Sequence, residues 1–261
     1  NKYTHEGGIR KLKSLLYNIV RELNIANLIH APINGKEVIF PFTIKMEDIK
    51  IIFKNKREIE PDKINNKPKC GIVNGLWANH LGIGGVLSIE VVWVPASQPM
   101  QVKATGNLEK VIKESTDVAT SVAWNYLPED TKEKFMEMWK NKSMGFHIHC
   151  PDGATPKDGP SAGGALTLAI YSLLTHRKIQ NNIAMTGEIN LQGRISAIGG
   201  LEEKLEGAKK AGCVLALVPK ENNIDLTKIV DRNPSLLDDN FKVILIENFG
   251  DIIKNALLPS S

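Results

Sequence analysis

The sequence predicts an α+β or α/β fold in which a small, mostly helical part precedes a larger domain built on a mixed β-sheet. Residues 4–29 have apolar residues at helical spacing, whereas residues 58–69 are polar, carry two prolines and two adjacent asparagines, and are typical of a linker. Beyond the linker, hairpin signals and crossover signals are mixed, which argues against a doubly wound sheet. We therefore divide the chain into residues 1–69 and residues 70–261.

The first part is expected to contain two helices. Thr4 is suited to cap the first, over residues 4–29, and its apolar stripe would consist of Ile9, Leu12, Leu16, Ile19 and Leu23. A second, short helix is predicted over residues 46–53. This part holds 14 Lys+Arg against 8 Asp+Glu, while residues 70–261 hold 19 against 21. The basic excess is compatible with binding to nucleic acid or nucleotide phosphates, but a solvated helical surface is the simpler interpretation.

The second part begins with strands and then alternates strands with helices. β-branched and alternating residues predict strands over residues 71–78, 85–94, 102–105 and 145–150, with helices over residues 108–126 and 132–140. A helix rich in Ala and Leu is predicted over residues 162–174, followed by strands at 183–186, 194–197 and 214–219, a polar turn at 190–193 and a helix at 201–211. Segments 225–231, 242–247 and 251–257 complete the alternation.

Composition limits the class of protein. The 261 residues contain no run of eighteen apolar residues and no secretory pattern, so we expect a soluble, non-secreted chain without a membrane partner. Because it starts at Asn1, we expect a fragment or a processed product. Cys70, Cys150 and Cys213 are odd in number and far apart, which favours free thiols in a reducing compartment such as the cytoplasm or the mitochondrial matrix.

The strand predicted at residues 145–150 places His147 and His149 on one face, opposite Phe146 and Ile148. Two histidines without further ligand motifs are weak evidence for zinc, so no metal site is predicted. Cys150 follows His149, but no supporting motif favours a Cys–His nucleophile.

Residues 156–164, Pro-Lys-Asp-Gly-Pro-Ser-Ala-Gly-Gly, have the pattern of a turn that leads into a helix. Asp158 and Gly159 form turns readily and Pro160 suits a first helical position, so Ser161 is expected in the first helical turn. Backbone N–H groups there lack helical partners and could stabilise an oxyanion formed beside Ser161. Taken alone, a serine at this position is more often simply a cap.

The helix predicted at residues 201–211 places Lys204 on its apolar face, which consists of Leu201, Leu205, Ala208 and Ala211. Burial favours the neutral amine, and lowering a lysine pKa from about 10.4 to about 7 costs roughly 4 to 5 kcal/mol. A neutral amine can take the proton of a serine hydroxyl, as in the Ser–Lys variant of triad chemistry. A lysine on such a face usually extends its amine to water, so neither residue alone indicates a protease.

Together the strings resemble a known family. Residues 156–163 resemble the nucleophile motif of Lon proteases, and residues 185–189 (Met-Thr-Gly-Glu-Ile) and 198–204 (Ile-Gly-Gly-Leu-Glu-Glu-Lys) resemble two further motifs of that family, in its order. The resemblance covers most of residues 70–258. It implies a mixed-sheet Lon-type proteolytic domain of the ribosomal protein S5 domain 2-like fold. Residues 3–10 (Tyr-Thr-His-Glu-Gly-Gly-Ile-Arg) resemble the start of the small helical subdomain of the family's AAA+ ATPase module.

Carried over by position, Ser161 matches the family nucleophile and Lys204 its general base. Thr186 matches a threonine that orients the lysine amine, whose hydrogen bond its hydroxyl can accept. Less specific supporting or regulatory roles are implied for Asp158, His149 and Glu90, and Arg10 matches an arginine that senses nucleotide in the intact ATPase.

The resemblance implies a serine endopeptidase that hydrolyses peptide bonds of unfolded proteins or peptides through an acyl-enzyme. An extended substrate would pair with an exposed strand edge at residues 72–78. Gly159 and Pro160 would lie beside the substrate and Trp77 would line a side-chain pocket, although a core position is the simpler interpretation of Trp77. Gly163 and Gly164 would allow close approach of neighbouring backbone.

For the intact protein the resemblance implies a homo-hexamer, with ATP and Mg²⁺ bound by the ATPase. This chain lacks a Gly-x-x-x-x-Gly-Lys-Ser/Thr phosphate loop, so no cofactor is expected in it. Two segments depart from the family: residues 77–85 are longer than expected, and residues 31–69 match poorly. Two alternatives remain open at this point, namely a non-catalytic assembly or nucleic-acid-associated module on the same fold, and a nucleic-acid-binding fragment that uses residues 1–69.

Overall fold

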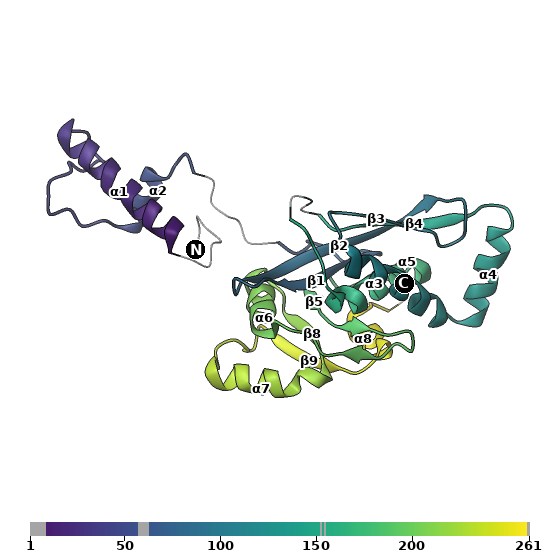
Figure 1. The fold of residues 1–261 in the computed structure, drawn as a ribbon. Helices are drawn as coiled ribbons and strands as arrows, with labels where there is room; N and C mark the ends of the chain where they lie inside the picture. Colours follow the sequence, from purple (N-terminus) through teal and green to yellow (C-terminus); the bar gives the residue numbers. More distant parts are fainter. Residues whose placement is uncertain (1–8, 57–62, 152, 154, 260–261) are drawn as a thin grey trace. The chain divides into compact units, whose positions relative to one another are not determined.

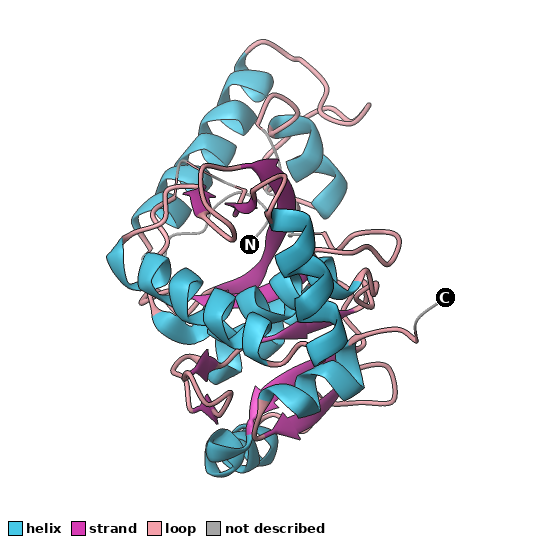
Figure 2. Ribbon diagram, turned by 90° about the vertical axis from the view of Figure 1, so that its right-hand side faces the viewer, coloured by secondary structure: helices cyan, strands magenta, loops and turns pink. Residues whose placement is uncertain are grey.

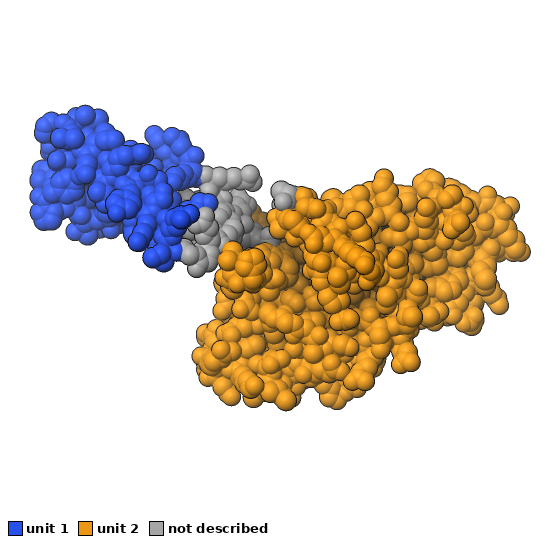
Figure 3. All heavy atoms as spheres, viewed as in Figure 1, with its two compact units in different colours: residues 1–60 blue, residues 61–261 orange. Residues whose placement is uncertain are grey.

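The computed structural model describes residues 9–56, 63–151, 153 and 155–259. The chain forms two compact units, Asn1–Glu60 and Pro61–Ser261, coloured separately in Figure 3. The division falls within the polar stretch that the sequence indicates as a linker.

Residues 63–69, which belong to that stretch, are packed against the second unit. Ile64 contacts its apolar core, and Lys69 forms a β-bridge with Ile179. Asn181 Nδ2 donates a hydrogen bond to the Asn65 carbonyl at 2.7 Å. These contacts place the boundary between the units before residue 63 rather than after residue 69.

The first unit contains the two predicted helices, α1 (Arg10–Leu28) and α2 (Met46–Ile52) (Figure 1). The proposed Thr4 cap lies outside the described residues. Three of the five residues predicted for the buried α1 stripe are wrong. The buried residues are Leu15, Ile19, Leu23 and Ala26, whereas Ile9, Leu12 and Leu16 are exposed. The helix has a wider apolar face than this small unit covers, so spacing alone did not identify the buried part.

The second unit is built on a seven-stranded mixed sheet with the strand order β3-β4-β2-β1-β5-β8-β9. The antiparallel pairs are β1–β2 and β2–β4, and the other neighbours are parallel. The strands are β1 (Ile72–Ala78), β2 (Gly84–Pro95), β3 (Val102–Thr105), β4 (Met144–His149), β5 (Ile183–Met185), β8 (Leu215–Pro219) and β9 (Lys242–Ile246). A separate antiparallel pair, β6 (Glu188–Ile189) and β7 (Ile195–Ser196), flanks the predicted polar turn. The mixed α+β architecture is therefore confirmed.

Helices lie against both faces of this sheet, as Figure 2 shows with helices in cyan and strands in magenta. One face is covered by α5 (Gly163–Thr175), against which α3 (Lys110–Asn125) and α8 (Phe249–Ala256) pack. The opposite face is covered by α6 (Leu201–Lys210), with α7 (Asn223–Arg232) beside it. The remaining elements are α4 (Glu129–Trp139) and two short 3₁₀ turns, η1 (Pro160–Ala162) and η2 (Lys220–Asn222).

Strand alternation explains why two cores form. Met185 and Leu217 point toward α5, while Ala184 and Ala216, their neighbours in sequence, point toward α6. Every residue of α5 except Leu173 and Thr175 is buried, which fits its Ala- and Leu-rich composition. The helix is therefore a rigid, central element, and the short turn η1 leads directly into it.

Helix α6 lies unusually close to the start of β2. A Cβ added at Gly84 would lie 2.1 Å from the Glu203 carbonyl oxygen, and one at Gly207 would lie 2.4 Å from the Gly85 amide nitrogen. Backbone therefore packs on backbone at this crossing, which only glycine permits. The contact sets the height of α6, and of Lys204, above the sheet.

The prediction that residues 72–78 form an exposed edge is wrong for the strand as a whole. β1 pairs with β2 along its full length, from Ile72↔Glu90 to Ala78↔Gly84. On its other side it pairs with β5 at Asn74 and Gly75, where β5 ends. The strand is central because β5 and β8 continue the sheet beyond it.

Gly84→Ala is expected to lower the free energy of unfolding by about 2 kcal/mol or more, since its methyl group would overlap main-chain atoms that cannot rotate away. Gly199→Ala is the matched control, because a Cβ there would meet nothing within 4 Å. Chemical denaturation of both variants measures the difference. Equal stability of the two variants would contradict the close helix–strand contact.

Candidate active site

Ser161 is held by its own backbone at the start of the central helix. It lies in η1 and is half-buried. Its carbonyl oxygen accepts hydrogen bonds from the Gly187 amide at 2.8 Å and from Thr186 Oγ1 at 3.3 Å. The Gly164 amide in turn donates to the Gly187 carbonyl at 3.0 Å. The segment after β5 thus fixes the backbone of Ser161 and leaves its hydroxyl free to face another element.

That element is α6. Lys204 Nζ lies 3.1 Å from Ser161 Oγ and 3.2 Å from Thr186 Oγ1. The lysine is 4% exposed and shares its helix face with the buried residues Leu201, Leu205 and Ala208. The expectation that Lys204 is buried rather than extended to solvent is confirmed.

Burial changes the protonation of this amine. Desolvation lowers the pKa of Lys204 from its ordinary value near 10.5 to about 8. The difference corresponds to about 3 kcal/mol at about 1.36 kcal/mol per unit, so about one amine in ten is neutral at pH 7. The neutral form has a lone pair that can accept the Ser161 hydroxyl proton.

Thr186 connects the two groups. Its hydroxyl donates to the Ser161 carbonyl and accepts from Lys204 Nζ, and the side chain is fully buried. Its backbone amide donates to the Leu217 carbonyl at 3.2 Å, which extends the β5–β8 pairing by one residue. The hydroxyl therefore acts as both donor and acceptor. Because its proton points to the Ser161 carbonyl, its lone pairs face Lys204 and orient the amine.

Asp158 lies three residues before the serine but its carboxylate binds elsewhere. Its Oδ1 accepts hydrogen bonds from the Val111 and Ile112 amides, at 3.0 and 3.2 Å. These amides are in the first turn of α3, whose own N-cap residue, Glu109, makes no side-chain cap bond. Asp158 therefore caps α3 from a distant loop and ties the serine loop to that helix.

His149 and Glu90 belong to a separate polar group on the sheet. They are cross-strand partners on β4 and β2. Thr105 Oγ1 lies 2.8 Å from His149 Nδ1 and 2.9 Å from His147 Nε2, so one hydroxyl joins both imidazoles. Phe146 and Ile148 are fully buried on the other face, as the alternation predicts. The hydrogen bonds identified for this group in the described residues do not reach Ser161 or Lys204.

The alternatives built on cysteine and on metal gain no support. Cys150 is fully buried, and desolvation raises the pKa of its thiol to about 11, which keeps it protonated and unreactive. Within the described ranges, no three His, Cys, Asp or Glu side chains lie close enough to hold a metal ion.

None of the described helices combines the length and the apolar character that a membrane crossing needs.

The expected substrate-binding residues lie around the serine and along β1. Gly159 and Pro160 directly precede Ser161 and are half-buried. Trp77 is half-buried and pairs with Gly85 on β2. A Cβ at Gly163 would lie 3.1 Å from the Ile189 amide nitrogen, so backbone approaches this glycine closely. A Cβ at Gly164 would meet side-chain atoms at 3.2 Å or more, and the Gly187 carbonyl oxygen would lie 3.5 Å away.

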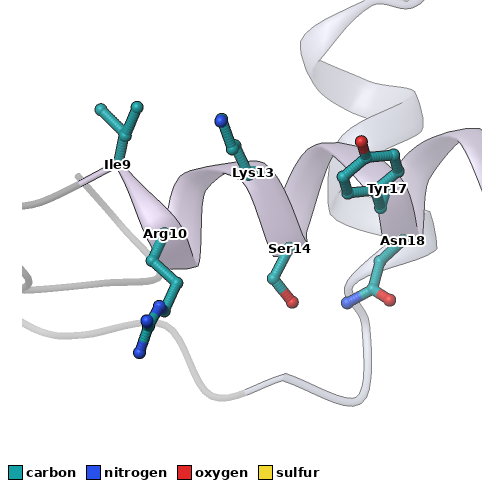
Figure 4. A pocket seen from close by; sticks show the side chains of 6 residues that line it. All are labelled: Ile9, Arg10, Lys13, Ser14, Tyr17 and Asn18. Atoms are coloured by element: carbon teal, nitrogen blue, oxygen red, sulfur yellow. The ribbon is translucent and has the colours of Figure 1, made fainter.

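Arg10 belongs to the first unit. It lies at the start of α1 and is exposed, in a shallow hollow that Lys13, Ser14 and Tyr17 also line (Figure 4). The hollow follows one face of a single helix. Its two cations suit phosphate groups, but one helix face can form only one wall of a nucleotide site.

Sequence reasoning missed residues that hold the site through their backbone. Gly187 binds Ser161 through its amide, and a Cβ there would lie 2.5 Å from Ile195 Cγ2. The sequence did contain an indication of this role, because the glycine lies inside the Met-Thr-Gly-Glu-Ile motif at residues 185–189. Its partner, Ser161, is distant in sequence, so only the fold reveals the contact.

Comparison with known proteins identifies the family. Residues 43–259 match the family model of the Lon protease (S16) C-terminal proteolytic domain. The chain belongs to the Lon protease family. The match begins at residue 43, so it includes part of residues 31–69, the segment that resembles the family poorly by its motifs.

Relatives extend the similarity to almost the whole chain. Lon protease of Campylobacter concisus is 36% identical over 98% of this chain, and Lon protease 1 of Thermus thermophilus is 36% identical over 97%. A Lon protease homolog of Acanthamoeba polyphaga mimivirus is 31% identical over 97%. The chain spans about a third of the length of these Lon relatives, at 32%, 30% and 29%.

Lys204→Met is expected to raise the free energy of unfolding at pH 7, by up to about 3 kcal/mol, because an apolar side chain avoids the desolvation cost of the ammonium. The folded pKa, about 8, lies below the ordinary value of 10.5. The unfolded chain therefore binds more protons between these values, and wild-type stability should rise with pH across this window. Denaturation at pH 7 and pH 10 measures both effects. If the variant is no more stable than wild type at pH 7, and if its free energy of unfolding rises equally toward pH 10, then Lys204 is not desolvated.

Asp158→Ala should lower stability by about 1 kcal/mol through loss of a helix cap. Asp158→Asn keeps an acceptor for the two amides and should stay close to wild type in stability and activity. Thermal denaturation and peptide hydrolysis compare the pair. If the asparagine variant is as impaired in hydrolysis as the alanine variant, the negative charge matters and capping is not the main role.

Proposed function

We propose that this chain is the peptidase part of a Lon-type serine endopeptidase, with Ser161 as nucleophile and Lys204 as general base. The observation that carries the proposal is the buried Lys204 amine, 3.1 Å from the Ser161 hydroxyl, with a pKa lowered by burial to about 8. A non-catalytic module would gain nothing from burying a lysine beside a serine at this cost.

The reaction follows from these positions. Neutral Lys204 accepts the Ser161 proton as Oγ attacks the substrate carbonyl carbon, which gives a tetrahedral oxyanion and a lysine ammonium. The intermediate collapses, the peptide C–N bond breaks, and the ammonium returns its proton to the leaving amine. The neutral lysine then deprotonates a water molecule that attacks the acyl-enzyme, and the proton passes back to Ser161 Oγ as the acid leaves.

The backbone supplies the oxyanion donors in this proposal. Ser161 and Ala162 follow Pro160 at the beginning of η1, where amides lack helical acceptors. The Gly163 amide is already used, since it donates to the Pro160 carbonyl. Because η1 continues into the rigid α5, these amides are fixed before the reaction begins.

An extended peptide would lie beside the carboxyl-terminal half of β1. β5 pairs with this strand only at Asn74 and Gly75, and Thr186 of the catalytic group follows β5 directly. A substrate strand at Leu76–Ala78 would continue the sheet past the end of β5 toward Ser161. Gly159 and Pro160 would border this path, and Trp77 would contact a substrate side chain.

The intact protein would be an ATP-dependent homo-hexamer that acts on unfolded proteins. Residues 1–69 would then be the small helical subdomain of the AAA+ module with its linker, and residues 70–261 a protease domain of ribosomal protein S5 domain 2-like fold. Arg10 would contact the nucleotide phosphates as one wall of the completed ATP site. The three cysteines are free, as expected in a reducing intracellular compartment.

Peptide hydrolysis tests the proposal. The chain is expected to cleave a short unstructured fluorogenic peptide, and Ser161→Ala should reduce the rate by about a thousandfold or more with an unchanged fold. The wild-type rate should rise with pH through a single inflection near 8, because only the neutral form of Lys204 is a base.

A serine-directed covalent probe gives a second measurement, since labelling of Ser161 needs the same base but no peptide binding. Its rate should show the same inflection, and Lys204→Met should suppress it. Two results together would reject the dyad and favour a non-catalytic module. The wild type and Ser161→Ala would hydrolyse the peptide equally, or neither would hydrolyse it, and the probe would not label Ser161.

A further inference from the structure

The loop that leads into the lysine helix is held by one buried side chain. Asn222, in η2, is 1% exposed. The Ile198 amide donates to Asn222 Oδ1 at 2.9 Å, and Asn222 Nδ2 donates to the Ile198 carbonyl at 2.9 Å. The side-chain amide thus binds both backbone groups of one residue, as a neighbouring strand would. The contact joins residues 24 apart in sequence.

The orientation of this amide is determined by its partners. The second Nδ2 proton is donated to Asp225 Oδ2 at 2.9 Å. Oδ1 must face the Ile198 N–H, and both Nδ2 protons have acceptors, so reversing the amide would break all three bonds. A buried group with every position satisfied resists displacement.

The bond to Ile198 lies one short loop away from the catalytic lysine. Gly199 and Gly200 follow Ile198, and α6 begins at Leu201. The Lys204 amide donates to the Gly200 carbonyl at 3.1 Å in the first turn of that helix. Gly200 has a left-handed conformation, with φ of 66°, so the chain turns sharply between the anchor and the helix. Anchoring Ile198 therefore determines where α6 begins.

α6 also rests on the start of β2 at two places, Glu203 against Gly84 and Gly207 against Gly85. These contacts set the height of the helix above the sheet, and the Asn222 anchor adds a third point at the loop that enters its first turn. The distances from Lys204 Nζ to Ser161 and Thr186, at 3.1 and 3.2 Å, tolerate little movement. A shift of about 0.5 Å would take both beyond hydrogen-bond range.

We propose that Asn222 is a positioning residue for the peptidase reaction, because its paired hydrogen bonds to Ile198 hold the start of α6 so that Lys204 reaches Ser161. This inference rests on the proposed Ser161–Lys204 dyad. Asn222 does not contact the reacting atoms. It acts through the loop of Ile198, Gly199 and Gly200.

Asn222→Ala tests the role in the full chain. Loss of the anchor should lower kcat by about tenfold or more with little change in KM, since the lysine and not the substrate path is displaced. Movement of the amine toward water should shift the inflection of the pH–rate profile upward by about half a pH unit or more. The labelling rate of Ser161 by a serine-directed probe should show the same shift without peptide turnover.

Ser172→Ala is the matched control. Ser172 is also fully buried and also binds two backbone groups, the Gly71 amide and the Arg177 carbonyl. It lies on α5, eleven residues after Ser161, which corresponds to about 16 Å along the helix axis. Its loss should reduce stability as much as the loss of Asn222, while the pH profile and kcat of the folded protein stay unchanged.

The outcomes separate a positioning role from a structural one. If Asn222→Ala loses stability like Ser172→Ala but keeps kcat and the wild-type inflection, the proposal is overturned. If Asn222→Ala does not fold, Asn222→Asp combined with Asp225→Asn replaces it. The new carboxylate keeps the acceptor for the Ile198 amide and loses the donor to its carbonyl, while the amide at position 225 avoids repulsion between two carboxylates. The same two readouts then decide.

Failure of the dyad itself would be visible separately. Ser161→Ala and Lys204→Met are measured in the same assays. Activity that survives in these two variants refutes the proposed function, whatever Asn222 does. Activity lost in them but unaffected in Asn222→Ala or in the double variant refutes only the positioning role.

Discussion

The second unit depends on one unfavourable placement, the burial of a lysine amine beside a serine hydroxyl. Removing the ammonium from water costs about 3 kcal/mol at neutral pH, a sizeable part of the stability of a typical domain. The surrounding structure must supply this energy and must also fix the amine to within a few tenths of an ångström. Three segments distant in sequence meet for this purpose: η1 with Ser161, the residues after β5 with Thr186, and α6 with Lys204.

The two members of the pair have opposite requirements, and the fold satisfies both at the end of the sheet. Lys204 needs a dry environment, which the α6 face and the start of β2 provide through close backbone contact at Gly84. Ser161, as the proposed nucleophile, needs access to substrate, and it is half-buried where the chain enters α5. Because β5 is only three residues long, its pairing with β1 stops at Gly75, before the strand ends. A longer β5 would pair with Leu76–Ala78, the part of β1 beside which we propose that an extended peptide lies.

Much of this arrangement could be predicted from periodicity, because periodicity reports local burial. The apolar spacing in α6 identified Lys204 as buried, and the alternation in β4 separated His147 and His149 from Phe146 and Ile148. Predictions that depended on distant partners were less reliable. Whether β1 had a free edge depended on β5, more than a hundred residues later. The apolar face of α1 was visible in the sequence, but the part that this small unit buries was not.

The residues that were hardest to predict share one physical role. Where a helix or strand begins or ends, backbone groups lack partners, and polar side chains supply the missing hydrogen bonds. Asp158 binds the first amides of α3, and Asn222 binds both backbone groups of Ile198. Each is a common turn or cap residue whose sequence context suggests a local function, while its partner is 24 to 47 residues away. The proposed catalytic site can expose its serine to substrate because such side chains, rather than additional strands, hold its loops in place.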